Sequence, residues 1–106
     1  ETPDGALLLM KIGVAQHAQG DVVGALRAYD EAKRARRITT TLESQDGALL
    51  FKNIGLAKAD GGDTDGALEA YAEERGVRER LKAMDTRDGA TLMTNVGALK
   101  RVAGDL

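Results

Sequence analysis

Apolar side chains recur at helical spacing in three separate stretches of the chain. In the middle stretch, Leu50, Ile54 and Ala57 follow the i, i+4, i+7 spacing that places side chains on one face of an α-helix. The corresponding positions in the other two stretches are Leu8, Ile12, Ala15, Leu92, Val96 and Leu99. We expect each of these faces to be buried in the core.

A second apolar pattern follows each of the first two stretches. Leu68, Tyr71 and Ala72 mark the inward face of one such segment, which we expect to continue to Leu81. The earlier copy has Leu26 and Tyr29 at the matching positions, followed by Leu42. Alanine, leucine, glutamate, lysine and arginine dominate the composition and favour helix. The pattern predicts five antiparallel helices, over about 5–19, 22–42, 47–60, 64–84 and 89–103.

The chain repeats itself with a fixed step. Asp4, Asp46 and Asp88 lie 42 positions apart, and each is followed by glycine and alanine. A period of this length is typical of stacked copies of one helical unit. We therefore expect an all-α fold, an α-solenoid of antiparallel helix hairpins with two full repeats and one helix of a third. The repeats span 4–45, 46–87 and 88–106 of a single domain over 1–106, which we expect to be a fragment of a longer protein.

Local signals predict where the helices begin and end. Asp46 and Asp63 are expected N-caps, because a carboxylate can accept a hydrogen bond from the free amides of a first turn. The preceding helix is expected to end around Asp60-Gly61-Gly62, where glycine permits the left-handed conformation of a helix C-terminus.

Two glycines, Gly13 and Gly55, lie in the middle of predicted helices one repeat apart. An interior glycine usually has a packing or functional reason. We expect both to allow close approach to a neighbouring helix at its small residues Ala25 and Ala67.

Charge and composition exclude several classes of function. The chain has 15 basic and 17 acidic residues, a net charge of −2, which argues against general binding to nucleic acid or to an anionic membrane. Its longest apolar run, Ala6 to Met10, is too short to span a bilayer, and no signal-peptide pattern is visible. Cysteine is absent, so thiolate metal sites and disulfides are excluded. We expect a cytoplasmic protein.

The residues do not form a recognisable catalytic or metal-binding set. His17 is the only histidine, and we expect a surface or groove-edge residue without a fixed acid partner. The basic run over 33–37 is expected to be a solvated helix end. The sequence predicts no catalysis, no cofactor and no metal.

The repeated residues resemble the tetratricopeptide repeat family over almost the whole chain. They are Ile12-Gly13, Gly20-Asp21, Ala25-Leu26, Tyr29, Ala32, Ile54-Gly55, Gly62-Asp63, Ala67-Leu68, Tyr71, Val96-Gly97 and Gly104-Asp105. The usual repeat has about 34 residues. The longer period here resembles the long-helix variant of kinesin light chains and of bacterial regulatory arrays. The resemblance implies a module that binds a protein or peptide.

In that family the first helix of each repeat lines a concave groove. Carried over by resemblance, the groove residues are Met10, Lys11, Val14, His17, Lys52, Asn53, Leu56, Thr94, Asn95 and Arg101. Asn53 and Asn95 can each offer a donor and an acceptor to a peptide backbone, and a cation such as Lys52 attracts a carboxylate. Val14 and Leu56 can instead complete packing between neighbouring helices.

Two functions remain open at this level. The first is a protein–protein interaction scaffold that presents the groove to a peptide or helix of a partner. The second is a structural spacer or self-association module for adjacent effector domains, with homo-oligomers formed through exposed repeat ends.

Overall fold

The computed structural model describes residues 3–82, 84, 86–102 and 104. Five helices account for most of them: α1 (Pro3–Ala18), α2 (Val22–Ile38), α3 (Gln45–Asp60), α4 (Thr64–Arg80) and α5 (Arg87–Val102). The described part of the chain contains no strand. The prediction of an all-α fold with five helices is therefore confirmed.

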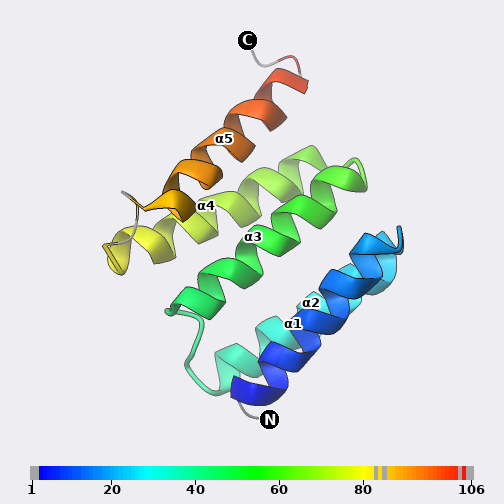
Figure 1. Ribbon diagram of the computed structural model, residues 1–106, viewed down its shortest axis with the longest axis vertical. Coiled ribbons are helices and arrows are strands. Elements are labelled where there is room, and N and C mark those ends of the chain that lie inside the picture. The colour runs from blue at the N-terminus through cyan, green and yellow to red at the C-terminus, as the bar shows by residue number, and fades with distance from the viewer. Residues whose placement is uncertain (1–2, 83, 85, 103, 105–106) are drawn as a thin grey trace.

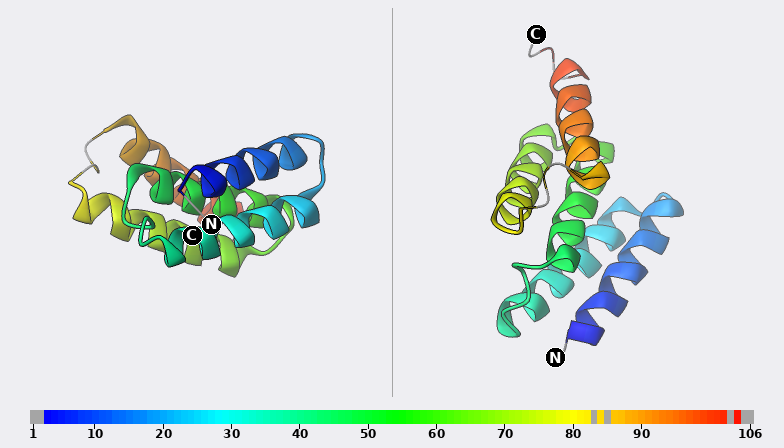
Figure 2. Two further views of the ribbon diagram at one scale, coloured as in Figure 1. Left: turned by 90° about the horizontal axis from the view of Figure 1, so that it is seen from below. Right: turned by 60° about the vertical axis from the view of Figure 1, so that its left-hand side comes forward.

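The helices pack as sequential antiparallel hairpins (Figure 1). α1 pairs with α2 and α3 with α4, while α5 packs against α4. α1, α3 and α5 form one layer, and α2 and α4 form the layer behind it, as both views of Figure 2 confirm. The molecule measures 42 × 33 × 19 Å.

Glycine and aspartate build the tight turns inside each hairpin, as predicted. Gly20 and Gly62 both have φ +86°, a conformation that L side chains rarely adopt. Asp21 and Asp63 then cap α2 and α4, each accepting a hydrogen bond from the backbone amide three residues ahead. The third such turn includes Asp105, which lies outside the described residues.

The prediction of Asp46 as the N-cap of α3 is wrong. Ser44 caps this helix, because its hydroxyl accepts the amide of Gly47 at 3.0 Å. Thr86 occupies the equivalent place before α5 and accepts the amide of Gly89 at 3.4 Å. Asp46 lies in the first turn instead, where a carboxylate is stabilised by the helix dipole.

The second helix of each hairpin ends about four residues earlier than predicted, at Ile38 and Arg80. The chain turns through Thr40 at φ 55° and Lys82 at φ 57°, so the left-handed residue is not a glycine. No glycine in the sequence therefore marks these two left-handed positions. Leu42 and Leu81 lie beyond the helices, and Leu81 is 39% exposed. Ala72, which was expected on the inward face of α4, is exposed as well.

The core stripe predicted on the first helix of each repeat is confirmed for α3, where Leu50, Ile54 and Ala57 are buried. It is wrong for α1, where Leu8 is 61% and Ile12 43% exposed and Ala15 is also exposed. The reason is positional. α2 covers this face of α3 and α4 covers it on α5, whereas no described helix covers it on α1.

The nearest side chain to each of the predicted mid-helix glycines, Gly13 and Gly55, is a tyrosine ring. A methyl group at Gly13 would lie 2.4 Å from Cε1 of Tyr29, and one at Gly55 would lie 2.4 Å from Cε1 of Tyr71. Both tyrosines are almost fully buried. The predicted close approach of the neighbouring helix at each glycine is therefore confirmed, and the nearest atoms there belong to a tyrosine ring.

Candidate binding surfaces

The residues predicted to line a groove all belong to the layer of α1, α3 and α5. Lys11, Val14, Thr94 and Arg101 are exposed, and His17, Lys52, Asn53, Leu56 and Asn95 are half-buried. Met10 is only 4% exposed and packs in the core, so it offers almost no surface to a partner and is not kept among the candidates. The remaining nine are accessible on a single layer, with α3 between α1 and α5 (Figure 2).

Acidic side chains on this layer already have partners. Asp46 lies 3.7 Å from Arg36, Asp88 lies 3.7 Å from Arg78, and Asp60 lies 2.5 Å from His17. Outside the first turn of each helix, Asp60 is the only acidic residue of α1, α3 and α5. Six cations of these three helices have no carboxylate of a described residue within 4.0 Å: Lys11, Lys52, Lys58, Arg87, Lys100 and Arg101. The layer therefore carries an excess of positive charge although the whole chain is slightly acidic.

His17 has an acid partner, contrary to the sequence prediction. Its Nε2 lies 2.5 Å from a carboxylate oxygen of Asp60, so the pair joins the end of α1 to the end of α3. The histidine side chain is 21% exposed and that of Asp60 65% exposed. The pair connects neighbouring hairpins on the same layer, which gives His17 a positioning role there.

The basic run over 33–37 is not a fully solvated helix end. Arg36 is only 2% exposed, and Arg78, one repeat later, is also 2% exposed. Each guanidinium reaches the first turn of the next hairpin, where it meets Asp46 or Asp88. Sequence reasoning missed this contact, although both members of each pair recur at the period of 42. The repeated arginine and aspartate thus connect consecutive repeats.

The two buried arginines differ in their remaining partners. Arg78 donates from Nε to Glu74 at 2.7 Å, and Glu74 is fully buried. Burial raises the pKa of Glu74 above its ordinary value, while the hydrogen bond from Arg78 opposes that shift. The equivalent of Glu74 in the first repeat is Ala32, and Nε of Arg36 has no hydrogen-bond partner among the described residues. Both side chains of this pair are enclosed, since Glu74 is 0% and Arg78 2% exposed.

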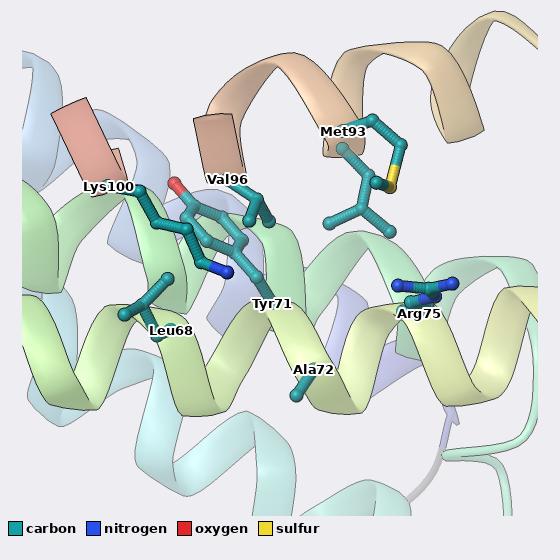
Figure 3. A pocket seen from close by; sticks show the side chains of 8 residues that line it. Leu68, Tyr71, Ala72, Arg75, Met93, Val96 and Lys100 are labelled. Carbon is teal, nitrogen blue, oxygen red and sulfur yellow. The ribbon is translucent and has the colours of Figure 1, made fainter. Parts of the chain in front are cut away.

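An apolar crevice opens between α4 and α5, with a volume of about 330 Å³ (Figure 3). Most of its lining side chains are apolar, and two are cationic. The side chains that line it are Leu68, Tyr71, Ala72, Arg75, Leu92, Met93, Val96 and Lys100.

The same junction one repeat earlier, between α2 and α3, is better filled. There Phe51 is 4% exposed and lies under the ammonium of Lys33, 5.5 Å from the ring centre. Its counterpart on α5 is Met93, which is 47% exposed. A cation above an aromatic ring is a favourable arrangement, and Arg75 stands where Lys33 stands. The α5 end is therefore the less completely covered of the two junctions.

Among the described side chains, no three histidine or acidic groups gather in a way that would hold a metal ion. No helix in the described ranges is long and apolar enough to cross a membrane. No protein-family model and no curated protein sequence matches this chain.

Proposed function

We propose that this chain is a protein-interaction module that receives an acidic peptide or helix of a partner on the layer of α1, α3 and α5. The observation that carries the proposal is the charge of that layer. Asp46, Asp60 and Asp88 each lie within 4.0 Å of a basic side chain. In contrast, Lys11, Lys52 and Arg101 have no carboxylate of a described residue within that distance. Complementary charge steers a partner to the surface and fixes its register.

Polar and apolar groups at the centre of the layer suit a peptide. Leu56 and Val14 offer apolar contact, and Val14 is 45% exposed. Asn53 and Asn95 are half-buried one repeat apart, so each can present a side-chain donor and acceptor to a peptide backbone. In this proposal the hairpins stack as an α-solenoid of the tetratricopeptide type, and catalysis plays no part.

Selection from a displayed peptide library against the purified protein tests this proposal. We expect the enriched peptides to be acidic and their binding to weaken steeply with salt. The double variant Lys52→Glu, Asn53→Ala should abolish binding, whereas Arg27→Glu, an exposed charge reversal on α2, should leave it intact. Enrichment of neutral or basic peptides, or binding that survives the α3 double variant, would refute the proposal.

A second role in self-association is favoured by one observation. Leu8, Ile12 and Val23 are 61%, 43% and 69% exposed and lie on α1 and α2 at the amino-terminal end of the stack. Exposed apolar clusters mark contact surfaces. Sedimentation velocity tests this role, since a dimer that becomes monomeric in the variant Leu8→Lys would support it. A monomer at high concentration would exclude it.

A further inference from the structure

Glu74 is a buried acid on α4, the helix against which both α3 and α5 pack. Its side chain is fully buried, and Oε2 accepts a 2.7 Å hydrogen bond from Nε of Arg78. The other oxygen, Oε1, is also buried and has no hydrogen-bond partner among the described residues. A buried carboxylate is costly unless its remaining lone pairs are also satisfied, so a second donor is expected for Oε1.

Three charged groups act on Glu74 from its own helix and from the two helices around it. Arg78 belongs to α4, Lys52 to α3 and Asp88 to α5. Arg78 already divides its guanidinium between Glu74 and Asp88, which lies 3.7 Å away. Burial raises the pKa of Glu74, and Arg78 and then Lys52 oppose that shift. Lys52 has no carboxylate of a described residue within 4.0 Å, so its ammonium is the donor available to Oε1.

The same two positions hold an uncharged pair in the first repeat. Lys52 corresponds to Met10, and Glu74 corresponds to Ala32, at the period of 42. Met10 and Ala32 are buried in one apolar cluster. The arginine that bonds Glu74 has an equivalent in both repeats and therefore does not by itself require a glutamate. Because both positions become charged together, lysine and glutamate are expected to act as a pair.

Lys52 is also one of the cations of the surface proposed above for an acidic peptide. It is half-buried on α3, so part of its stem is covered while its ammonium stays near that surface. A lysine carries its charge on a flexible stem of four carbons. Its ammonium can therefore turn inward to Oε1 of Glu74 or outward to a carboxylate of a partner.

We propose that Glu74 is an internal competitor for Lys52, holding its ammonium while the surface is empty and releasing it to a carboxylate of the acidic peptide. The proposal rests on the function proposed above and concerns the regulation of the same surface. Glu74 is too deeply buried to touch a peptide, so it acts on binding only through Lys52 and is a positioning residue.

The competition makes peptide binding depend on pH with a defined sign. When the peptide takes the ammonium, Glu74 loses a neighbouring positive charge, its pKa rises, and the complex binds more protons than the free protein. Because the coupling is reciprocal, the peptide must then bind more tightly as pH falls through the folded pKa of Glu74. The carboxylates of the peptide itself stay ionised above about pH 5.

Nuclear magnetic resonance of the protein without peptide tests the pair itself. The pKa of Glu74 is measured from the titration of its side-chain carboxyl carbon, and Lys52→Met should raise it. Lys58→Met is the matched control, because it removes another unpaired cation from α3 that does not act on Glu74, and it should leave the pKa unchanged. A pKa that ignores Lys52→Met would overturn the proposal.

Binding of a labelled peptide from the acidic pool enriched in the selection described above tests the competition by fluorescence anisotropy. At a pH well above the measured pKa of Glu74, the variant Glu74→Gln should bind about fivefold more tightly, the size expected for one lysine–carboxylate pair. Glu73→Gln is the matched control, because this neighbouring acid is exposed and lies near Lys33 of α2, and it should bind as the wild type does. In the Lys52→Met background, Glu74→Gln should have no effect.

The pH profile supplies a readout that a purely structural role of Glu74 would not change. The difference between wild type and Glu74→Gln should close as pH falls, and the comparison removes the contribution of His17, which is common to both proteins. Parallel profiles, or a variant Glu74→Gln that binds no more tightly than Glu73→Gln, would overturn the inference and leave the proposed function standing. Failure to enrich any acidic peptide would refute the proposed function and the competition together, and the titration would still decide whether Lys52 and Glu74 interact.

Discussion

Alanine at the three equivalent glycines should change stability in opposite directions. Gly13, Gly55 and Gly97 occupy the same place in three helices, so the change in helix propensity is the same at each. Replacing an interior glycine by alanine favours a helix by about 1 kcal/mol. Any difference between the three variants therefore reports on what each glycine contacts.

At two positions the new methyl group meets a tyrosine ring. A methyl at Gly13 or Gly55 would lie 2.4 Å from a ring carbon, whereas ordinary van der Waals contact begins at 3.4 Å. The ring is buried, so either the ring or the helix must shift, and such overpacking costs about 1–3 kcal/mol. After the gain in propensity, we expect Gly13→Ala and Gly55→Ala to lower the free energy of unfolding by up to about 2 kcal/mol.

At Gly97 no such contact exists among the described residues. We expect Gly97→Ala to raise the free energy of unfolding by about 0.5–1 kcal/mol. Urea denaturation followed by circular dichroism measures all three variants, with linear extrapolation to water. In a Tyr29→Leu background the cost of Gly13→Ala should shrink, because the two side chains would no longer clash.

Equal stabilisation of all three alanine variants would refute these expectations, because it would mean that the tyrosine rings move without cost and that the glycines do not set the helix spacing. A loss of stability in the variant Gly97→Ala would also refute them, because the structure shows open space beside that glycine.

Three further predictions follow from the described contacts. Ser44→Ala should lower the free energy of unfolding by about 1 kcal/mol through loss of the cap of α3, as measured by urea denaturation, and a value near zero would restore Asp46 as the cap. Burial raises the pKa of Glu74, so its contribution to stability is present below the ordinary pKa of 4.5 and is lost as pH rises through the folded value. Thermal unfolding of Glu74→Gln across pH should therefore show that the variant gains on the wild type as pH rises, and an unchanged difference would contradict this. The hydrogen bond from Arg80 lowers the pKa of Glu43, so the stability that this pair contributes is lost as pH falls, and the difference between wild type and Arg80→Gln should narrow in acid.

The repeating pattern was sufficient to predict the five described helices, the hairpin turns and the buried face of α3. It succeeded at Leu50, Ile54 and Tyr71 because helical periodicity and burial coincide where a helix is covered on both sides. It was wrong at Leu8 and Ile12 because a repeated sequence pattern shows which side chains a repeat can bury but not which neighbouring helix covers them. The first helix is therefore less buried than its repeated pattern predicts.

The contacts between repeats were harder to predict from the sequence. Arg36 sits in a basic run that reads as exposed, and only the structure shows that it is buried against the first turn of α3. A partner ten residues away in sequence, in the next hairpin, leaves no local pattern. The recurrence of arginine and aspartate as Arg78 and Asp88 was the one signal that could have revealed it.

The apolar side chains exposed on α1 and α2 limit how copies can associate through them. Leu8 and Ile12 are 61% and 43% exposed on α1, and Val23 is 69% exposed on α2. Two copies of one patch can meet across a two-fold axis, which uses the same surface on both molecules and closes at the dimer. Self-association through this patch alone would therefore stop at two copies.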